Sequence, residues 1–414
     1  MFRLTRAQVQ PIGVDLGHDA VKMLQVEVVG GDQLRVVAAA REEVPHDVRR
    51  DPRGRAAAAA DVVRRLLRTG GFHGRRVVAA LPREALHVKN LRMPVIPAAE
   101  LDAAVQFEAR NVFPFDIDRA QVRCLPAGEV RQGNDHRQEV ILLAARDADI
   151  EAHVELLHRT GAQVDSLDPE PCALYRVVER FIRRKEDEQD VHVLVEVGWR
   201  RAHVVIGRGR DVVFYKPIDV GGRHLTDAVA RKLTIAATEA QGLRRRLAET
   251  PVPPGEGDPG RGFRDPVRQA VYDGVRATIE ELAREISLCL RYYSVTFRGS
   301  RPTRLRLVGG EGCDPVLQAA LSATLPLPVE AGRPLYSVNT AVMSAADRRG
   351  PMGEWAVALG LSLKRTAGHF GPRDGRPRDQ ARPAGADVGS GAQHLADVDA
   401  AVRATVPVME VARA

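Results

Sequence analysis

The stretch Ile12–Val26, "IGVDLGHDAVKMLQV", decides the fold, because it places a carboxylate inside an apolar strand just before a glycine turn. The strand reaches Asp15, turns at Gly17 and resumes as "AVKMLQV". A buried carboxylate is costly unless a cation compensates it. Two interpretations are open on this stretch alone: an aspartate at a strand edge beside a tight turn, or an acid that serves a binding cleft.

The same order of features recurs downstream in "VLVEVGWRRAHVVIG", Val193–Gly207. Here Glu196 precedes Gly198, and a second apolar strand follows. Two copies of strand, acid, glycine turn and strand predict a duplicated domain, since internal repetition is a signal at the level of the fold. A third stretch, "LRLVGGEGCDPVLQAAL", ends a strand at two glycines and begins a helix with a proline in its first turn.

Three glycine turns of this kind can surround a polyphosphate and a nucleoside. Glycine lets backbone N–H groups approach phosphate oxygens closely, and the strand-end acids can hold a hydrated Mg²⁺. Each motif is weak alone. In this order and at these separations, the set indicates a nucleotide cleft.

With these motifs, the chain resembles the actin/Hsp70/sugar-kinase superfamily and, within it, the FtsA-like PilM proteins of type IV pilus machinery, over roughly Pro11 to Lys364. "GVDLGHDAVK" is similar to the phosphate-1 segment, "LVEVGWRRAHVV" to phosphate 2, and "LVGGEG" to the adenosine turn. "DPEPCALYRV" resembles the first connecting helix. The segments "IDVGGRHLTDAVARKL", "EELAREISLCLRYY" and "FEARNVFPF" are also similar to PilM segments.

The resemblance implies an α/β fold of duplicated actin-like (ribonuclease-H-like) domains, with a small α/β insertion in the first and a helical insertion in the second. The expected boundaries are 11–87 with 167–188 for the first domain, 88–166 for its insertion, 189–222 with 300–365 for the second domain, and 223–299 for its insertion. In the first insertion, the strand "HVKNLRMP" precedes a helix from Ala98 to about Val112. Residues 366–414 are of low complexity and are expected to be disordered.

The resemblance also implies the site residues. It assigns nucleotide binding to Asp15, Gly17, His18, Lys22, Glu196, Gly198, Gly221, Gly222, Gln241, Arg244, Gly309 and Gly310. Asp15 and Glu196 would hold Mg²⁺ through water if ATP binds. Glu170 would position a hydrolytic water. The alternative for Glu170 is an acid at a helix N-terminus, favoured there by the helix dipole.

The side chains around the expected phosphates depart from the family pattern. His18 and Asp19 replace small hydroxylic residues, and a carboxylate beside a terminal phosphate costs on the order of several kcal/mol in a low-dielectric cleft. In the triplet "WRR" that starts at residue 199, the tryptophan would fill the place of a phosphate, whereas either arginine would clamp one. Glu311 replaces a small residue after the two glycines. We therefore expect a cleft in which Mg-ATP binds weakly or not at all.

Composition narrows the class of protein. With 414 residues and 44% hydrophobic residues, the chain is long enough for two or three domains with real cores. The 61 basic and 54 acidic residues predict a mixed surface, and no basic stripe with interleaved aromatics favours nucleic acid. The four cysteines form no CxxC pair, which argues against a disulfide framework or a zinc site. Without a spanning apolar run or a secretory signal, we expect a cytoplasmic protein.

Two functions of different class remain open. The first, favoured by the resemblance, is a cytoplasmic adaptor at the inner face of the inner membrane. It would bind the short cytoplasmic tail of a PilN-like inner-membrane protein in a groove between the first domain and its insertion, in a pilus or related secretion machine. Homo-oligomers are also possible for such a protein. The second is a slow ATPase of the actin-like superfamily.

Overall fold

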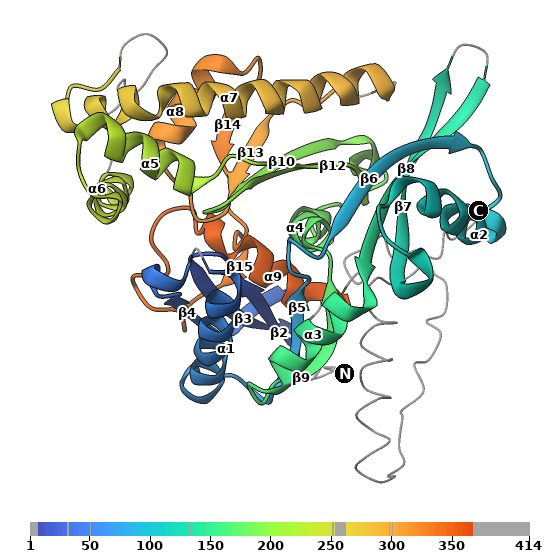
Figure 1. Cartoon of the computed structure of the whole chain (residues 1–414), viewed down its shortest axis with the longest axis horizontal. Coiled ribbons are helices and arrows are strands. Elements are labelled where there is room, and N and C mark those ends of the chain that lie inside the picture. Colours follow the sequence, from blue (N-terminus) through green and yellow to red (C-terminus); the bar gives the residue numbers. More distant parts are fainter. Residues whose placement is uncertain are drawn as a thin grey trace.

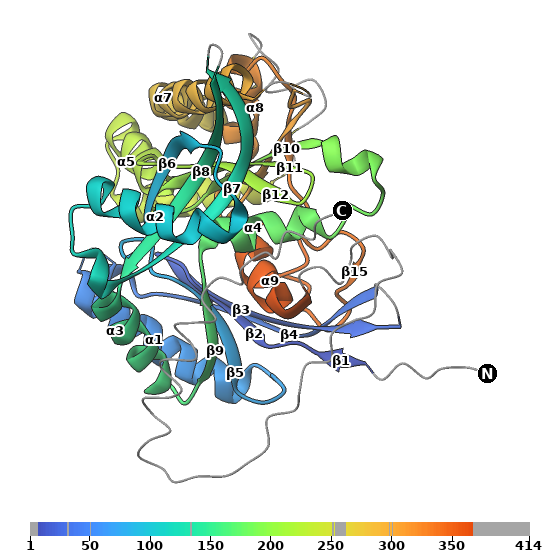
Figure 2. The ribbon, with the colours of Figure 1, turned by 90° about the vertical axis from the view of Figure 1, so that its right-hand side faces the viewer.

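The computed structural model describes residues 7–30, 33–49, 51–132, 135–250, 252, 262–297, 299 and 301–366. Two sheets lie one above the other, with helices between and around them, and a third, smaller sheet lies at one side (Figures 1 and 2). The tail from residue 367 onward, expected to be disordered, lies outside the described residues. Within the described ranges, no helix has both the length and the apolar character that a membrane span requires.

The first sheet has seven strands in the order β15-β4-β3-β2-β5-β9, with β1 paired to β3. The hairpin β2–β3 and its neighbour β4 are antiparallel, whereas β2, β5 and β9 run parallel. The strand bounds are β1 Gln8–Val9, β2 Ile12–Leu16, β3 Ala20–Val29, β4 Gln33–Glu43, β5 Arg76–Ala80, β9 Gln163–Asp168 and β15 Val338–Asn339. The opening stretch therefore forms the central hairpin of this sheet.

Helices cover both faces of the first sheet because its central strands are apolar on both sides. Val14 and Met23 pack with residues of α1 (Pro52–Thr69) and α3 (Asp147–His158). Leu24 and Val26 pack instead with α9 (Ala356–Ser362). The helix α4 (Glu170–Glu179) also lies against α9 and reaches the second sheet. This double cover makes the hairpin a rigid support for Asp15.

The second sheet repeats the pattern of the first in the order β12-β11-β10-β13-β14. Its hairpin β10–β11 is antiparallel, and β10 runs parallel to β13, as β2 does to β5. The bounds are β10 Val191–Val197, β11 Ala202–Arg208, β12 Asp211–Ile218, β13 Leu305–Val308 and β14 Val329–Ala331. The duplicated strand-acid-glycine motif thus occupies equivalent places in two similar sheets.

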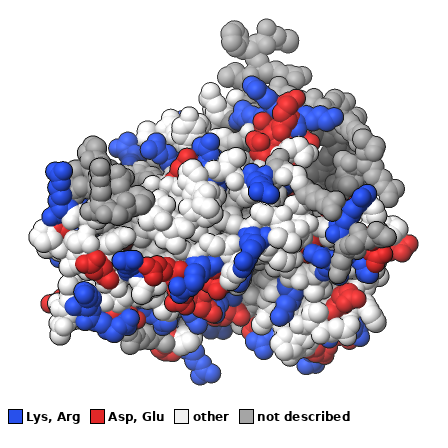
Figure 3. All heavy atoms as spheres, turned by 90° about the horizontal axis from the view of Figure 1, so that it is seen from above, with Lys and Arg blue, Asp and Glu red and all other residues white. Residues whose placement is uncertain are grey.

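Four helices accompany the second sheet: α5 (Gly222–Leu233), α6 (Ala237–Glu249), α7 (Pro266–Thr296) and α8 (Pro315–Thr324). The long helix α7 crosses the top of the molecule in Figure 1. Seen from that side, acidic and basic side chains interleave without a field of one sign (Figure 3). The described side chains of this face therefore form no continuous positive surface for a polyanion.

The third sheet has the order β6-β8-β7 and is antiparallel throughout. It comprises β6 (His87–Pro94), β7 (Ala120–Gln132) and β8 (Asp135–Arg146), and α2 (Ala98–Val112) packs on it. The expected helix from Ala98 is confirmed. Short 3₁₀ helices complete the chain at His46–Val48, Ile117–Arg119, Glu186–Gln189, Gly353–Trp355 and Leu363–Thr366.

The last described segment differs from the expected domain division. Residues 300–365 were expected in the second domain, but β15 pairs in parallel with β4 of the first sheet. Trp355, Leu359 and Leu363 join the apolar cluster under β3. One face of the β2–β3 hairpin is apolar and is not covered by α1 or α3, so burying it from water is favourable. The segment that follows the second sheet packs against this face. The other boundaries stay predictions.

Candidate functional site

The residues predicted from the sequence lie at strand ends and helix starts around the space between the two large sheets. Asp15, Gly17, His18 and Lys22 belong to the β2–β3 hairpin; Glu196 and Gly198 end β10; Gly309 and Gly310 follow β13; Gly221 and Gly222 begin α5; Gln241 and Arg244 lie on α6; Glu170 begins α4. A cavity of about 790 Å³ brings together Lys22, Gln241, Arg244 and Gly310. Asp15, His18 and Glu170 line a separate, smaller pocket of about 120 Å³.

The cation that compensates Asp15 is Lys22. The two residues stand opposite each other in the β2–β3 ladder, and Lys22 Nζ lies 3.1 Å from Asp15 Oδ2. Both side chains are buried. Burial alone would lower the pKa of Lys22, but Asp15 and the neighbouring acid Asp19 raise it, so the ammonium stays charged. The question posed by the opening stretch is therefore answered within the hairpin itself.

Arg83, in the loop after β5, lies between the other two acids of the expected site. Its Nε and Nη2 each lie 2.7 Å from an oxygen of Glu170, which makes a two-pronged ion pair. Its contact with Glu196 is longer, 3.4 Å from Nη2 to Oε2. Burial would lower the pKa of Arg83, but Glu170 and Glu196 raise it. An internal guanidinium thus contacts both acids, closely at Glu170 and loosely at Glu196.

The backbone N–H groups of the glycine turns are used within the chain. Gly198 donates to Arg201 O at 3.0 Å, and Gly222 donates to Gly198 O at 2.9 Å. Gly309 donates to Gly353 O at 3.0 Å. Gly309 has a φ of +91°, and a Cβ there would lie 2.6 Å from Val197 O, so only glycine fits this turn. These three amides are not free to bind a phosphate in this arrangement.

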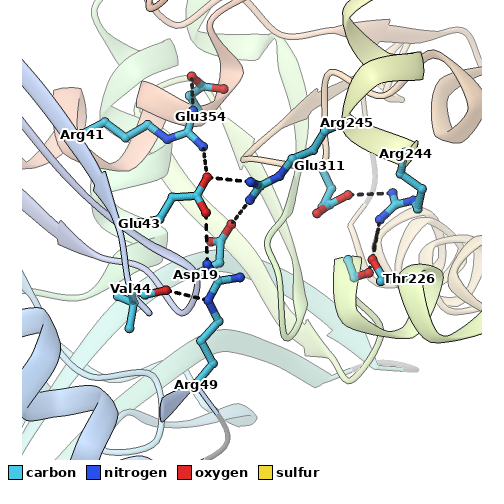
Figure 4. Close-up of polar contacts among 11 residues, drawn as sticks. Asp19, Arg41, Glu43, Val44, Arg49, Thr226, Arg244, Arg245, Glu311 and Glu354 are labelled. Atoms are coloured by element: carbon cyan, nitrogen blue, oxygen red, sulfur yellow. Dashed lines mark hydrogen bonds and ion pairs between the residues drawn. The ribbon is translucent and has the colours of Figure 1, made fainter. Parts of the chain in front are cut away.

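An ion-pair cluster around Arg244 lines the larger cavity (Figure 4). Arg244 Nη2 lies 2.7 Å from Glu311 Oε2 and 2.9 Å from Asp314 Oδ2. Its Nη1 donates to Gly222 O and to Thr226 Oγ1, each at 3.2 Å. Glu311, which departs from the family pattern, thus holds the arginine that was predicted to contact a nucleoside.

A second cluster bridges the mouth of the cavity, from the first sheet to α6 (Figure 4). Arg245 of α6 lies 2.6 Å from Glu43 and 3.7 Å from Asp19. Arg41 joins Glu43 to Glu354 at 3.9 and 3.7 Å. Asp19, which was expected to repel a phosphate, is therefore paired with Arg245, a cation on a helix that accompanies the second sheet.

Of the remaining unusual side chains, Trp199 and Arg200 have internal partners, whereas Nδ1 of the half-buried His18 has none among the described residues. Trp199 is buried, with the guanidinium of Arg49 5.9 Å from its ring centroid. Arg200 pairs with Glu84 at 2.5 Å. Burial, followed by the charges of nearby arginines, lowers the pKa of His18 to about 4, so its imidazole is neutral at pH 7. None of these three groups is aimed at a phosphate as an unpaired cation.

These contacts do not fit a bound Mg-ATP. Of the two acids expected to hold Mg²⁺, Asp15 is paired with Lys22, which leaves Glu196 as the one remaining carboxylate of that pair. Phosphates need donors, but the turn amides and Arg244 already have partners. The proposed roles of the site residues in binding stay predictions.

Comparison with known proteins places the chain in a family. A family model described as "Type IV pilus assembly protein PilM" matches residues 13–251. The chain belongs to this family. A comparison with curated proteins gives no match.

The solved structure of a PilM-PilN complex agrees with the fold of this PilM-family chain. The protein of a "PilM-PilN type IV pilus biogenesis complex" is 23% identical, with a TM-score of 0.69, over 86% of this chain and 98% of that one. The ethanolamine utilization protein EutJ from Carboxydothermus hydrogenoformans is 14% identical, with a TM-score of 0.49, over 88% of this chain and 92% of that one. The expected fold class, an α/β fold of duplicated actin-like domains, is confirmed.

Sequence reasoning missed Arg83 and Arg245. Arg83 follows Pro82 in a loop, where no motif distinguishes it from other surface arginines of this arginine-rich chain. Arg245 stands beside Arg244 in the run "GLRRRL", which suggests only an exposed helix face. The one available signal was electrostatic: three acids predicted at one cleft require nearby cations.

Proposed function

We propose that this PilM-family protein is a cytoplasmic adaptor that binds the short cytoplasmic tail of a PilN-like inner-membrane protein. The machine would be a type IV pilus or a related secretion system. The partner would supply the membrane anchor. In this role the residues of the nucleotide cleft stabilise the fold, and the protein hydrolyses ATP at a negligible rate.

The observation that carries this proposal is the likeness to the protein solved in the PilM-PilN complex, of which the present chain covers 98%. That protein assembles with PilN according to its description. Family membership over residues 13–251 includes the whole third sheet, which an actin-like core does not need for nucleotide chemistry. Binding a partner protein would give the third sheet a function.

A small apolar pocket of about 20 Å³, too small to hold a peptide itself, marks the junction at which we place the binding. Leu81 and Leu86 from the loop after β5, Leu143 of β8 and Ile150 of α3 line it, where the third sheet meets the first domain. The sheet also has two edge strands, β6 and β7. Edge strands offer unpaired backbone groups, and short tails bind through a few apolar anchors together with such pairing.

The electrostatics of the cleft support the lack of turnover. Glu170, the expected catalytic acid, is 3% exposed and is held by both prongs of Arg83. Both of its oxygens accept hydrogen bonds from Arg83, and these compete with an attacking water for the carboxylate. ATP hydrolysis that is abolished by Glu170→Ala, or sub-micromolar affinity for Mg-ATP, would contradict this part of the proposal.

The test is a calorimetric titration of the full-length protein with the N-terminal peptide of the PilN-like membrane protein encoded beside it. We expect binding by the wild type and a loss of at least tenfold in affinity for Leu86→Ser, since Leu86 is a half-buried lining residue. The matched control is Leu288→Ser, on α7, where the leucine is 42% exposed. Thermal unfolding checks that both variants fold. No binding by the wild type, or equal binding by both variants, would refute the proposal.

A further inference from the structure

Glu196 is a buried carboxylate with too little positive charge around it. The buried acids of the cleft are Asp15, Glu170 and Glu196, whereas the facing bases are Lys22 and Arg83. Lys22 is used by Asp15, and both prongs of Arg83 are used by Glu170. Glu196, 4% exposed, retains only the 3.4 Å contact with Arg83. A second cation beside Glu196 would complete the pairing of the three acids.

His203 lies directly beside Glu196 and has a free ring nitrogen. The two residues stand opposite each other in the β10–β11 ladder, so their side chains share one face of the sheet. His203 is 2% exposed. Its Nδ1 lies 2.6 Å from the hydroxyl of Tyr215 on β12, while its buried Nε2 has no hydrogen-bond partner among the described residues.

The contact with Tyr215 fixes the imidazole in the orientation that a ligand needs. A histidine that binds a metal through one nitrogen is held through the other by a neighbouring oxygen, and this partner sets the ring orientation. With Nδ1 engaged by Tyr215, Nε2 is the ring nitrogen left to bind an ion.

We propose that Glu170, Glu196 and His203 form a binding site for a divalent transition-metal ion, with Zn²⁺ as the best match, that requires no nucleotide. One ligand atom from each residue lies within 4.8 Å of those of the other two. Two carboxylates and one imidazole are a donor set that suits Zn²⁺. Mg²⁺ prefers oxygen ligands, so the imidazole selects against it.

Arg83 and the metal ion are compatible. A carboxylate has two oxygens with about four lone-pair sites, and the prongs of Arg83 use one site on each oxygen of Glu170. The ion would replace the missing positive charge beside Glu196. It would also join the start of α4 to the hairpin of the second sheet, because Glu170 belongs to one and the two other ligands to the other.

A proton on Glu196 is the competing way to balance the charge. Burial, assisted by Glu170 and Asp15, raises the pKa of Glu196 to about 8. At the present atom positions, however, a proton on Glu196 would not reach His203 Nε2, which has no hydrogen-bond partner among the described residues. The metal satisfies both groups, which is why the free nitrogen favours it.

The test uses full-length protein stripped with EDTA and titrated with Zn²⁺ or with Mg²⁺, and with Co²⁺ as a spectroscopic probe. We expect one equivalent of Zn²⁺ to bind, visible Co²⁺ absorption bands typical of a mixed nitrogen and oxygen site, and no comparable binding of Mg²⁺. His203→Asn shortens the side chain and removes Nε2, and should weaken Zn²⁺ binding at least a hundredfold. His192→Asn is the matched control, because His192 lies on the same strand as Glu196 but outside the cluster.

A second variant protects the test against misfolding. Tyr215→Phe removes only the hydroxyl that orients His203, and should weaken Zn²⁺ binding about 10- to 100-fold, with altered Co²⁺ bands. The proposal is overturned if the wild type binds no stoichiometric Zn²⁺, or if His203→Asn and Tyr215→Phe both bind as the wild type does. These readouts involve no peptide, so they fail or succeed independently of the adaptor role.

Discussion

Two helical glycines, Gly360 and Gly242, have opposite surroundings, and the difference decides what a methyl group does at each. A Cβ on Gly360 of α9 would lie 1.9 Å from Ala173 O of α4, a backbone atom that cannot move away. A Cβ on Gly242 of α6 would meet only the end of the flexible Arg246 side chain, at 3.4 Å. Gly360 is thus a packing requirement between two helices, whereas Gly242 only weakens its helix.

We therefore expect Gly360→Ala to lower the free energy of unfolding by about 1–3 kcal/mol through overpacking. Gly242→Ala should raise it by about 0.5–1 kcal/mol, because alanine is the better helix former. Urea unfolding followed by circular dichroism measures both changes. Equal effects of the two substitutions would show that the close contact between α9 and α4 does not constrain the fold.

A single buried histidine, His153, makes the free energy of unfolding depend on pH. It is buried on α3, with Nε2 3.1 Å from Ala80 O, and burial lowers its pKa to about 4. Between that value and the ordinary pKa of 6.5, the unfolded chain binds a proton that the folded chain does not. The stability contributed by His153 is present above pH 6.5 and is lost as the pH falls towards 4, by about 3 kcal/mol in all.

His153→Gln retains a donor for Ala80 O but does not titrate. We expect a plot of unfolding free energy against pH to be flatter for this variant than for the wild type between pH 6.5 and 4. Denaturant unfolding at several pH values supplies the plot. Identical slopes would mean that His153 is not kept neutral by the fold.

At the scale of helices and strands, repeating sequence patterns predicted the structure better than individual residues did. The helix from Ala98 to Val112 and the paired strand–glycine–strand motifs follow from apolar periodicity and turn residues, which are local properties. The two-residue strand β15 carries no such pattern, because its pairing with β4 depends on the chain returning from far away. Arg83 and Arg245 were missed for the same reason: their partners come from other elements.

The start of α1 illustrates a local signal that can be tested. Asp51 caps the helix by accepting hydrogen bonds from Arg53 N at 3.1 Å and Gly54 N at 2.9 Å, with Pro52 as the first helical residue. Asp51→Ala should therefore cost about 1 kcal/mol of unfolding free energy. Asp47→Ala, at an exposed position just before the helix, should change it by less than about 0.5 kcal/mol. If both variants unfold at the same urea concentration, the cap contributes nothing.

At the scale of the whole molecule, ion pairs connect the half that contains the first sheet with the half that contains the second sheet. Arg83 joins the loop after β5 to Glu170 of α4 and Glu196 of β10, and Arg245 joins α6 to Glu43 of β4. The two arginines differ in burial: the Arg83 side chain is 22% exposed and its partner Glu170 3%, whereas Arg245 is 40% exposed and Glu43 46%. Solvent screens the outer pair and hardly reaches the carboxylate of the inner one.

Because the two arginines differ in burial, we expect their replacement by alanine to lower the stability by different amounts. In metal-free buffer, Arg83→Ala should lower the free energy of unfolding by about 3–5 kcal/mol, because it leaves buried carboxylates without their cation. Arg245→Ala should cost at most about 1 kcal/mol, and the cost should shrink as salt is raised from 0.05 to about 0.5 M, an order-of-magnitude range over which screening becomes strong. Urea unfolding of both variants at the two salt concentrations makes the comparison. A large, salt-independent loss for Arg245→Ala, or a small loss for Arg83→Ala, would mean that the halves are held together by packing rather than by the buried arginine.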